Sequence, residues 1–430
     1  MPYDLAIIGA GWAGINAAIR AKELGLKTIL LEKKDLGGTC LNSGCIPTKA
    51  LIQSAKIFDY VNRAGEFGIQ TITAQPDIAA MQSRIDKLIR QLRKGLEQML
   101  KGIDFMPGEA KFLGSDTLQL KDKQIKAKNF IIASGSKPKE LNELKFDAKK
   151  ILSSEDILKI HNIPKNILIV GAGAIGCEFA GLFSILKSEV TLVEIMAQLL
   201  PGLDMEVSRK LETLFKKKSI KVITQAQIQS LDTSGYELIL ICAGRSVVTQ
   251  GLGLEKIGIQ LQADNIHIDQ FSKTNLANIY AAGDCTAKLM LAHFASFQGR
   301  LAVENIVQPN SQKLIANSNI PCAIFTDPEI ASVGITEDEA RKEDLKIEVR
   351  RLDFLSSGMA RILGKTDGFM KLVIDSGSLK ILGVSIIGPQ ASEIIGFFTL
   401  AINNGLSIAQ LKRAILPHPS ISESIADILK

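Results

Sequence analysis

A pair of cysteines and two glycine-rich turns are the features of this sequence that could carry out chemistry. Cys40 and Cys45 are separated by four residues, one of which is Gly44. Two thiols at this spacing can close a small ring if the backbone bends sharply, and such a disulfide would be strained and exchangeable. Reduced, inert cysteines are the commoner state inside cells, but the glycine- and proline-rich setting favours the reactive interpretation. The other four cysteines lack that setting and are expected to pack in the core.

Each glycine-rich turn fits the fingerprint of a dinucleotide-binding site. Each follows an apolar run, opens a predicted helix and has a glutamate 23 positions after its first glycine. The glycines permit a tight strand-to-helix turn, the helix N-terminus attracts the pyrophosphate, and the glutamate accepts hydrogen bonds from a ribose diol. The predicted cofactor-binding residues are Gly9, Gly11, Gly14 and Glu32 in the first turn, and Gly171, Gly173, Gly176 and Glu194 in the second.

Glu194 also bears on which nicotinamide cofactor is used. A 2′-phosphate would require cations near the end of this strand, and residues 195–200 contain none. A carboxylate beside a phosphate dianion would be repelled. NAD is therefore favoured over NADP at the second site.

Two βαβ units are expected to position the turns. The first has strands over 3–8 and 27–32 around a helix over 13–24. The second has strands over 167–170 and 190–194 around a helix over 174–186, and the motif repeats only once, 162 positions on, which indicates a duplicated domain. Further strands are expected over 129–133, 238–243, 278–282, 371–374 and 381–387, and further helices from about 48 and over 77–101, 337–342, 392–403 and 407–411.

Bulk properties limit the class of protein. A chain of 430 residues is expected to form two to four domains, and 46% hydrophobic with 22% charged residues excludes a disordered chain. The net charge of +6 is spread along the chain, so a nucleic-acid partner is disfavoured. Every long apolar run is interrupted, and Asp4 interrupts the N-terminal one, so neither a membrane span nor a signal peptide is expected. We expect a soluble protein of the cytoplasm or another reducing compartment.

Residues 37–49, GGTCLNSGCIPTK, resemble the redox-active motif of the flavoprotein pyridine nucleotide-disulfide oxidoreductases. The similarity extends over essentially the whole chain and is strongest toward the dihydrolipoamide dehydrogenases. Other matching segments are 171–178, 193–194, 200–204, 244–245, 283–284, 290–293 and 418–423. The resemblance implies an α/β fold of two Rossmann-like dinucleotide-binding domains and a C-terminal α+β dimerisation domain. The expected boundaries are 1–150 for the FAD domain, completed by about 273–318, then 151–272 for the NAD domain and 319–430 for the interface domain.

The same resemblance assigns FAD to the first glycine turn and NAD to the second. Cys40 and Cys45 would form the redox-active disulfide, with Cys45 against the flavin and Cys40 exchanging with substrate. Lys49 would lie beside the reactive flavin nitrogen, with Glu178 as its ion-pair partner. The remaining cofactor contacts implied are Gly135 and Asp284 for FAD and Gly244 for NAD.

His418 and Glu423 resemble the acid–base pair of the family. An imidazole with a pKa near neutral suits the proton transfer that forms a thiolate. A carboxylate on the other ring nitrogen fixes the tautomer and stabilises the cation. His161 and His267 are interpreted as ordinary histidines, and no metal site is predicted.

The activity implied is FAD-dependent oxidation of dihydrolipoamide by NAD⁺. The chain would be a homodimer and the E3 component of a 2-oxoacid dehydrogenase complex, acting on the lipoyl domain of its acyltransferase. Alternatives are another disulfide or metal-ion reductase of the superfamily, or a non-catalytic structural subunit of such a complex. The chain departs from the family in a short 221–245 segment, in Val247-Val248 where Pro-Asn is usual, and in Leu416-Pro417 where a further histidine is usual.

Overall fold

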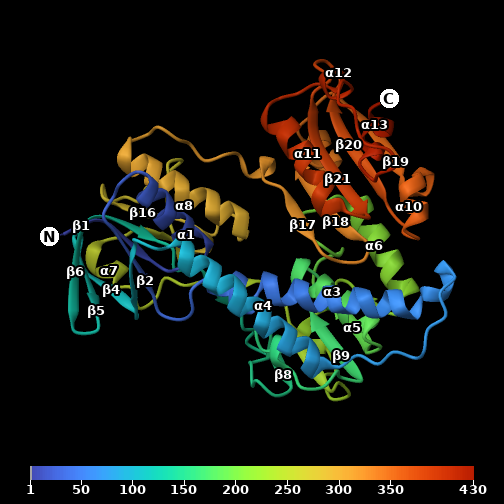
Figure 1. Cartoon of the computed structure of the whole chain (residues 1–430), viewed down its shortest axis with the longest axis horizontal. Coiled ribbons are helices and arrows are strands. Elements are labelled where there is room, and N and C mark those ends of the chain that lie inside the picture. The colour runs from blue at the N-terminus through green and yellow to red at the C-terminus, as the bar shows by residue number, and fades with distance from the viewer. Residues whose placement is uncertain (1) are drawn as a thin grey trace. The chain divides into compact units, whose positions relative to one another are not determined.

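The sheet that carries the first glycine turn is built around the predicted N-terminal strand (Figure 1). The computed structural model describes residues 2–430, and β1 (Tyr3–Ile8) lies between β2 (Thr28–Glu32) and β6 (Lys123–Ile132), parallel to both. β3 (Asp104–Pro107) pairs with β2, and β16 (Ile279–Ala281) pairs with β6, again in parallel. β2 is buried along its whole length, as is typical of a parallel strand covered on both faces.

Two helices pack tightly against each other beside this sheet. α1 (Trp12–Glu23) follows the first glycine turn and packs along α8 (Ala292–Val307). A Cβ atom at Gly299 would lie 2.1 Å from the backbone oxygen of Ala13, so only glycine permits this approach of the two backbones. The contact brings a segment from near residue 300 onto the N-terminal βαβ unit.

Short antiparallel strand pairs accompany the parallel sheet of the first glycine turn. β4 and β5 form a hairpin that continues antiparallel onto β6, and β7 pairs with β13 as a two-stranded ribbon. The bounds are β4 (Ala110–Gly114), β5 (Thr117–Leu120), β7 (Ser136–Pro138), β13 (Arg245–Val247), β14 (Leu261–Gln262), β15 (Asn265–Ile266) and α7 (Leu254–Ile257).

By internal packing the chain divides into two units. The first unit contains residues up to Leu51, Ala79–Lys139 and Arg245–Ile315, and the second contains Ile52–Ile78, Glu140–Gly244 and Ala316–Lys430. The first unit therefore holds the first glycine turn and both candidate redox cysteines. The second holds the other glycine turn and the C-terminal sheet.

The second glycine turn lies in a five-stranded parallel sheet ordered β11-β10-β9-β12-β8. The bounds are β8 (Ile151–Ser153), β9 (Asn166–Val170), β10 (Glu189–Val193), β11 (Lys221–Ile223) and β12 (Leu238–Ile241). α5 (Ala174–Ile185) follows β9 and α6 (Met205–Lys217) precedes β11. This is the predicted repeat of the βαβ arrangement.

The short connection between β11 and β12 has a structural consequence. Residues 224–237, all within the described chain, contain one 3₁₀ turn and no strand. Apolar side chains such as Phe146, Ile228, Leu231 and Tyr236 pack against the buried core of this sheet instead. Side chains from loops thus pack against the core of this sheet.

The C-terminal part is an antiparallel sheet covered by helices. Its strand order is β17-β18-β21-β20-β19, and α11 packs on β18 and β21. Phe354, Met370 and Phe398 lie in its core, each fully buried. The bounds are β17 (Cys322–Ile324), β18 (Glu329–Gly334), β19 (Ile347–Asp353), β20 (Phe369–Asp375), β21 (Ile381–Gly388), α9 (Glu337–Lys342), α10 (Gly358–Ile362), α11 (Ala391–Asn403), α12 (Ile408–Leu411) and α13 (Glu423–Leu429).

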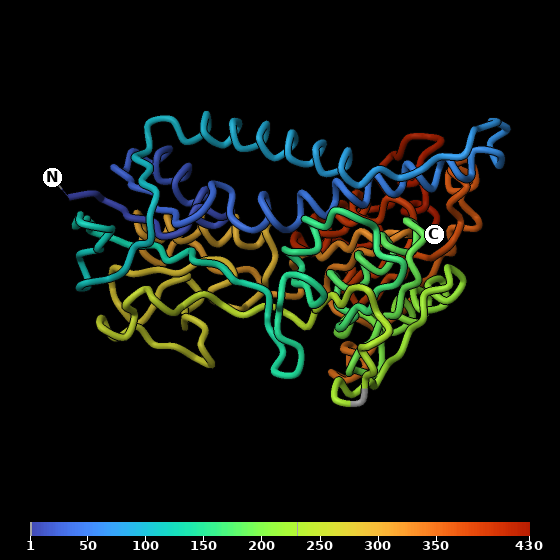
Figure 2. Tube along the Cα trace, turned by 90° about the horizontal axis from the view of Figure 1, so that it is seen from below, coloured from blue at the N-terminus to red at the C-terminus, as the bar shows by residue number. Residues whose placement is uncertain are grey.

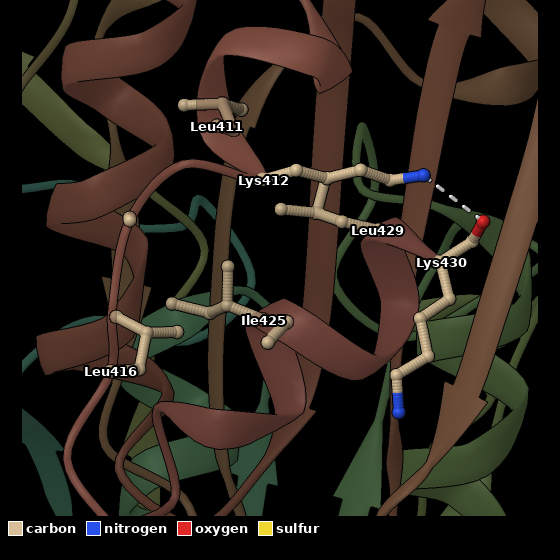
Figure 3. A pocket seen from close by; sticks show the side chains of 8 residues that line it. Leu411, Lys412, Leu416, Ile425, Leu429 and Lys430 are labelled. Atoms are coloured by element: carbon tan, nitrogen blue, oxygen red, sulfur yellow. Dashed lines mark hydrogen bonds between the residues drawn. The ribbon is translucent and has the colours of Figure 1, made fainter.

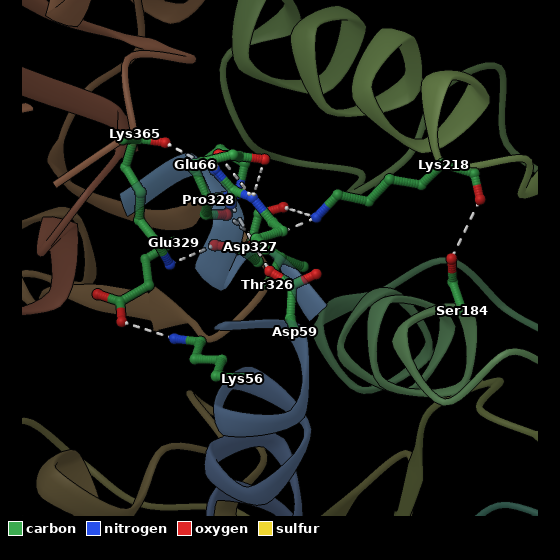
Figure 4. A network of polar contacts seen from close by, with 12 residues as sticks. Lys56, Asp59, Glu66, Ser184, Lys218, Thr326, Asp327, Pro328, Glu329 and Lys365 are labelled. Atoms are coloured by element: carbon green, nitrogen blue, oxygen red, sulfur yellow. Dashed lines mark hydrogen bonds and ion pairs between the residues drawn. The ribbon is translucent and has the colours of Figure 1, made fainter. Parts of the chain in front are cut away.

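A partly buried carboxylate joins the C-terminal part to the end of α6 within the second unit (Figure 4). Asp327 Oδ2 lies 3.2 Å from Lys218 Nζ, and Asp327 Oδ1 lies 3.0 Å from Lys365 Nζ. Burial alone would raise the pKa of Asp327, but the two cations hold it at about 2. Asp327 is therefore ionised at neutral pH and its charge is matched on both sides.

The predicted fold class is confirmed: two Rossmann-type sheets precede an α+β C-terminal domain. Most predicted elements differ from the structure by only a few residues at their ends. The C-terminal strand β19 and the β4–β5 hairpin were not predicted. None of the helices within residues 2–430 is long and apolar enough to cross a membrane.

Candidate active site and cofactor sites

The first glycine turn is shaped by the protein itself at its outer positions and left open at its centre. A Cβ at Gly9, whose φ is +103°, would lie 2.2 Å from the oxygen of Ala133, and one at Gly14 would lie 1.8 Å from the oxygen of Gly9. A Cβ at Gly11 would meet no atom of the described chain within 4 Å. The outer glycines are therefore required by packing, whereas the central one preserves space for a ligand.

The second turn repeats this pattern. A Cβ at Gly171 would lie 2.5 Å from the oxygen of Cys242, and one at Gly176 would lie 1.9 Å from the oxygen of Gly171. At Gly173 a Cβ would again meet nothing within 4 Å among the described residues. The central glycine of both turns therefore has open space beside it, which fits a pyrophosphate passing close to the backbone.

The two predicted glutamates hold matching positions beside the turns. Glu32 accepts hydrogen bonds from the backbone N–H of Ala10 at 2.6 Å and of Lys34 at 2.8 Å. Glu194 accepts from Ala172 at 2.7 Å and from Met196 at 2.9 Å. Each buried carboxylate is thereby fixed at the end of its second strand, where a ribose diol would lie.

The helices that follow the turns are free to receive an anion. Gly11 and Gly173 are the N-cap residues of α1 and α5, and within the described chain neither helix has a side-chain cap or an acid in its first turn. The first N–H groups and the positive end of the helix dipole therefore point at the open space. These residues fit the pyrophosphate of a dinucleotide at each turn.

Cys40 and Cys45 lie on two consecutive helices that are interrupted between them. α2 (Gly38–Ser43) ends at Gly44, whose φ and ψ of −139° and −112° break the helix, and α3 (Cys45–Asn62) begins with Cys45. Both cysteines are free thiols in this structure and are hydrogen-bonded to each other. That hydrogen bond, together with burial, holds the pKa of Cys40 far above its usual value. At Cys45 the positive end of α3 favours a negative charge.

The cysteine helices are held against the first glycine turn and against α4. A Cβ at Gly38, the first residue of α2, would lie 2.7 Å from the Cα atom of Gly11. α4 (Ile78–Met99), the long continuous light-blue coil in Figure 2, donates hydrogen bonds from Arg84 to the carbonyl of Ala50 and from Arg93 to the side chain of Asn42. The thiol pair is thus fixed beside the open space at Gly11.

The other cysteines of the two sheets differ from this pair. Cys177 and Cys285 are fully buried, and burial raises the pKa of both thiols, that of Cys285 to about 11. Neither would be ionised at neutral pH, so both serve as small apolar side chains.

Asp284, the predicted FAD ligand, lies in a hydrogen-bonded chain of three side chains. Ser136 Oγ donates to Asp284 Oδ2 at 2.5 Å, and Arg245 Nε donates to Ser136 Oγ at 2.7 Å. Gly135, also assigned to FAD, has a φ of +74° and open space around it. Sequence reasoning did not give Ser136 or Arg245 a role, because no local pattern shows that residues more than 100 positions apart meet.

His418 and Glu423 are paired as the resemblance predicts. His418 Nδ1 lies 2.8 Å from Glu423 Oε1, and Glu423 Oε2 accepts the backbone N–H of Ser420 at 2.9 Å. These two contacts, the backbone one first, lower the pKa of Glu423. The His418 side chain is 82% exposed in the single chain, and pairing through Nδ1 makes Nε2 the nitrogen available for proton transfer.

A pocket of about 340 Å³ lies beside the segment that carries this pair (Figure 3). It is lined by residues of α12, α13 and the intervening chain, among them Leu411, Leu416, Ile425 and Leu429. Its lining contains neither a thiol nor an imidazole. The cavity is therefore a packing feature of the C-terminal part and not the reaction site.

Of the three remaining predicted positions, Lys49 lies in the first unit and Glu178 and Gly244 lie in the second. Lys49 is one helical turn after Cys45 in the first unit, and its charge lowers the pKa of Cys40 without offsetting the larger effects. Glu178 is buried on α5 and accepts the backbone N–H of Phe325 at 2.9 Å. Gly244 follows β12 with a φ of +100°. The Lys49–Glu178 ion pair and the Gly244 contact to NAD stay predictions.

Comparison with known proteins agrees with this geometry. Residues 3–299 match the family described as pyridine nucleotide-disulphide oxidoreductase, and residues 320–428 match the dimerisation domain of the same family. The chain belongs to this family. It is thus an oxidoreductase of a family that uses FAD and NAD(H), as the two glycine turns predict.

Individual relatives of this family cover nearly the whole chain. The dihydrolipoyl dehydrogenase of Chlamydia pneumoniae is 37% identical over 99% of this chain and 96% of the relative. That of Bacillus subtilis is 35% identical over 99% of this chain and 97% of the relative. Among solved structures, LpdA from Mycobacterium tuberculosis has a TM-score of 0.92 at 25% identity, covering 99% of this chain and 98% of that chain. The HOCl-induced flavoprotein disulfide reductase RclA from Escherichia coli, as its Cu(II) complex, has a TM-score of 0.90 at 25% identity, covering 100% and 99%.

Proposed function

We propose that this chain is a homodimeric dihydrolipoamide:NAD⁺ oxidoreductase and the E3 component of a 2-oxoacid dehydrogenase complex. The observation that carries the proposal is the Cys40/Cys45 pair, on α2 and at the start of α3, held beside the open centre of the first glycine turn. Relatives named dihydrolipoyl dehydrogenase, 35–37% identical over nearly the whole chain, support the substrate.

The residues of this chain perform a thiol–disulfide exchange. A substrate thiolate attacks the sulfur of Cys40 in the Cys40–Cys45 disulfide, which breaks the S–S bond and releases Cys45 as a thiolate. The second substrate thiol then attacks the substrate sulfur of this mixed disulfide and displaces Cys40. The substrate leaves as a cyclic disulfide, and two electrons and two protons pass to the cysteine pair. When bound, FAD supplies a two-electron carrier between that dithiol and NAD⁺.

A base is needed because a thiol of dihydrolipoamide must lose its proton before it can attack the Cys40–Cys45 disulfide. His418 is the proposed base, with Glu423 holding the tautomer that leaves Nε2 available. His418 lies in the dimerisation domain and is 82% exposed in the single chain, which suits an imidazole that acts on the Cys40 of the partner subunit.

His418→Gln tests the base. The variant should keep its flavin and its dimer but oxidise dihydrolipoamide about 10²–10⁴-fold more slowly, the usual effect of losing a general base. His161→Gln, a change at an exposed histidine of the same unit, should leave the rate unchanged. Equal rates for the wild type and His418→Gln would refute the assignment.

Subunit exchange tests where the base acts. Heterodimers of His418→Gln with Cys40→Ser would contain one complete site if the base comes from the partner subunit. Activity should therefore appear on mixing two inactive proteins. No recovery, despite demonstrated exchange of subunits, would show that His418 acts within its own chain or not at all.

A second candidate is a reductase of another disulfide. Leu416-Pro417 stands where dihydrolipoamide dehydrogenases usually have a further histidine, and the chain is also similar to the E. coli flavoprotein disulfide reductase. An anaerobic titration separates the two. Reduction of the flavin spectrum by dihydrolipoamide supports the first proposal, whereas reduction by NADH alone, with no response to dihydrolipoamide, supports the second.

A further inference from the structure

Two of the places where the chain crosses between the units lie at one two-stranded ribbon. β7 and β13 pair antiparallel, with Ser136 opposite Val247 and Pro138 opposite Arg245. The first unit ends at Lys139 on one strand and resumes at Arg245 on the other. Arg245 is thus the first residue of the unit after the long excursion through the second glycine turn.

Arg245 makes two hydrogen bonds to Ser136 on the opposite strand of this ribbon. Its Nε donates to Ser136 Oγ at 2.7 Å and its Nη2 donates to the Ser136 carbonyl at 3.0 Å. The Arg245 side chain is only 14% exposed, so both hydrogen bonds are largely shielded from water. The guanidinium thus donates one hydrogen bond to the hydroxyl and one to the backbone carbonyl of Ser136.

Ser136, held by Arg245, is in turn hydrogen-bonded to Asp284. A serine hydroxyl has one proton to donate, and that of Ser136 is donated to Asp284 Oδ2 at 2.5 Å. Because the hydroxyl accepts from Arg245 Nε, its proton is turned toward the carboxylate. Arg245 Nε itself lies 4.0 Å from Asp284 Oδ2. One carboxylate oxygen is thereby fixed, and Oδ1 is oriented as an acceptor.

We propose that Arg245 and Ser136 are positioning residues that act through Asp284 and so set how tightly the flavin is held. This inference rests on the proposed function in one respect, since it takes FAD to occupy the first glycine turn. It does not depend on which thiol substrate the enzyme oxidises. It implies that the β7–β13 ribbon, which carries two of the connections between the units, is hydrogen-bonded to the residue that holds the flavin.

The rate of flavin release from the diluted holoenzyme tests the proposal, because flavin fluorescence rises on release. Ser136→Ala removes a charge-assisted hydrogen bond and should speed release about 10- to 100-fold. Ser136→Thr keeps the hydroxyl and should restore slow release. Ser134→Ala is the matched control: Ser134 lies two residues away and donates to the carbonyl of Val248, not to Asp284.

A double-mutant cycle distinguishes positioning from a general loss of structure. If Ser136 acts through Asp284, then Ser136→Ala should have little effect in an Asp284→Asn background, while Ser134→Ala should have the same effect in both backgrounds. Arg245→Met should behave as Ser136→Ala does. Additive effects of Ser136→Ala and Asp284→Asn would overturn the proposal and leave the proposed function standing. A folded wild-type protein without flavin would overturn both.

Discussion

Replacing Lys371 by methionine should destabilise the second unit much more than replacing Lys210. Lys371 Nζ lies 3.0 Å from Asp204 Oδ2, 2.7 Å from Glu206 Oε1 and 2.6 Å from Glu337 Oε2. Lys371 and Asp204 are each only 4% exposed. One buried cation therefore joins the start of α6 to β20 and α9.

Lys210 is a suitable control because, like Lys371, it forms an ion pair between α6 and the C-terminal part but is more exposed. Lys210 on α6 also reaches a carboxylate of the C-terminal part, Asp367, at 3.1 Å, but the two side chains are 30% and 53% exposed. Removing one partner of a buried ion pair costs about 3–5 kcal/mol, because the charge left behind has no compensation. An exposed pair contributes about 0.2–1 kcal/mol. Lys371→Met should therefore lower the free energy of unfolding several times more than Lys210→Met.

The loss of unfolding free energy caused by Lys371→Met should also become smaller as the pH falls. The hydrogen bond from Lys371 is the first cause that lowers the pKa of Glu337 below its usual 4.5. The stability from such a carboxyl is fully present above its unfolded pKa and is lost as the pH falls through its folded pKa. In Lys371→Met the three carboxylates face one another without their lysine, so proton uptake relieves their repulsion. Both effects reduce the difference between wild type and variant in acid.

Urea unfolding followed by far-ultraviolet circular dichroism measures both effects, at about pH 7.5 and about pH 5 and at matched flavin content. The single tryptophan, Trp12, lies in the first unit, so its fluorescence reports separately on that unit. The variant should lose the dichroism signal at lower urea than the Trp12 signal. A loss of stability no larger than that of Lys210→Met, or one equal at both pH values, would refute the reasoning.

Two further predictions concern the second glycine turn. Gly173→Ala adds a Cβ into open space, so the protein should fold and keep its flavin but show a raised KM for NAD⁺. Gly176→Ala places a Cβ 1.9 Å from the oxygen of Gly171 and should give little folded protein. Soluble yield and steady-state kinetics check both variants, and a well-folded Gly176→Ala would contradict the packing argument. NAD⁺ should also be preferred strongly over NADP⁺, because Glu194 is fixed where a 2′-phosphate would lie. Comparing kcat/KM for the two acceptors decides this, and equal values would contradict the charge argument.

The sequence by itself determined the parts that depend on neighbours along the chain. Glycine spacing placed both turns, and apolar runs predicted β1, β9, α1 and α5 to within a few residues, because strand and helix periodicity are local properties. The Gly9–Gly14 contact needs only one turn of backbone. His418 and Glu423 are only five positions apart, and the resemblance to the family predicted their pairing.

Tertiary structure alone decided the contacts between distant segments. Ser136 meets Arg245 and Asp284 across 109 and 148 positions, and Lys371 meets Asp204 and Glu206 from another part of the chain. Polar side chains of this kind have no periodicity, since each is positioned by the packing of the strand or helix that carries it. Only the folded backbone brings such groups together away from water, and burial then makes an ordinary serine or lysine strongly constrained.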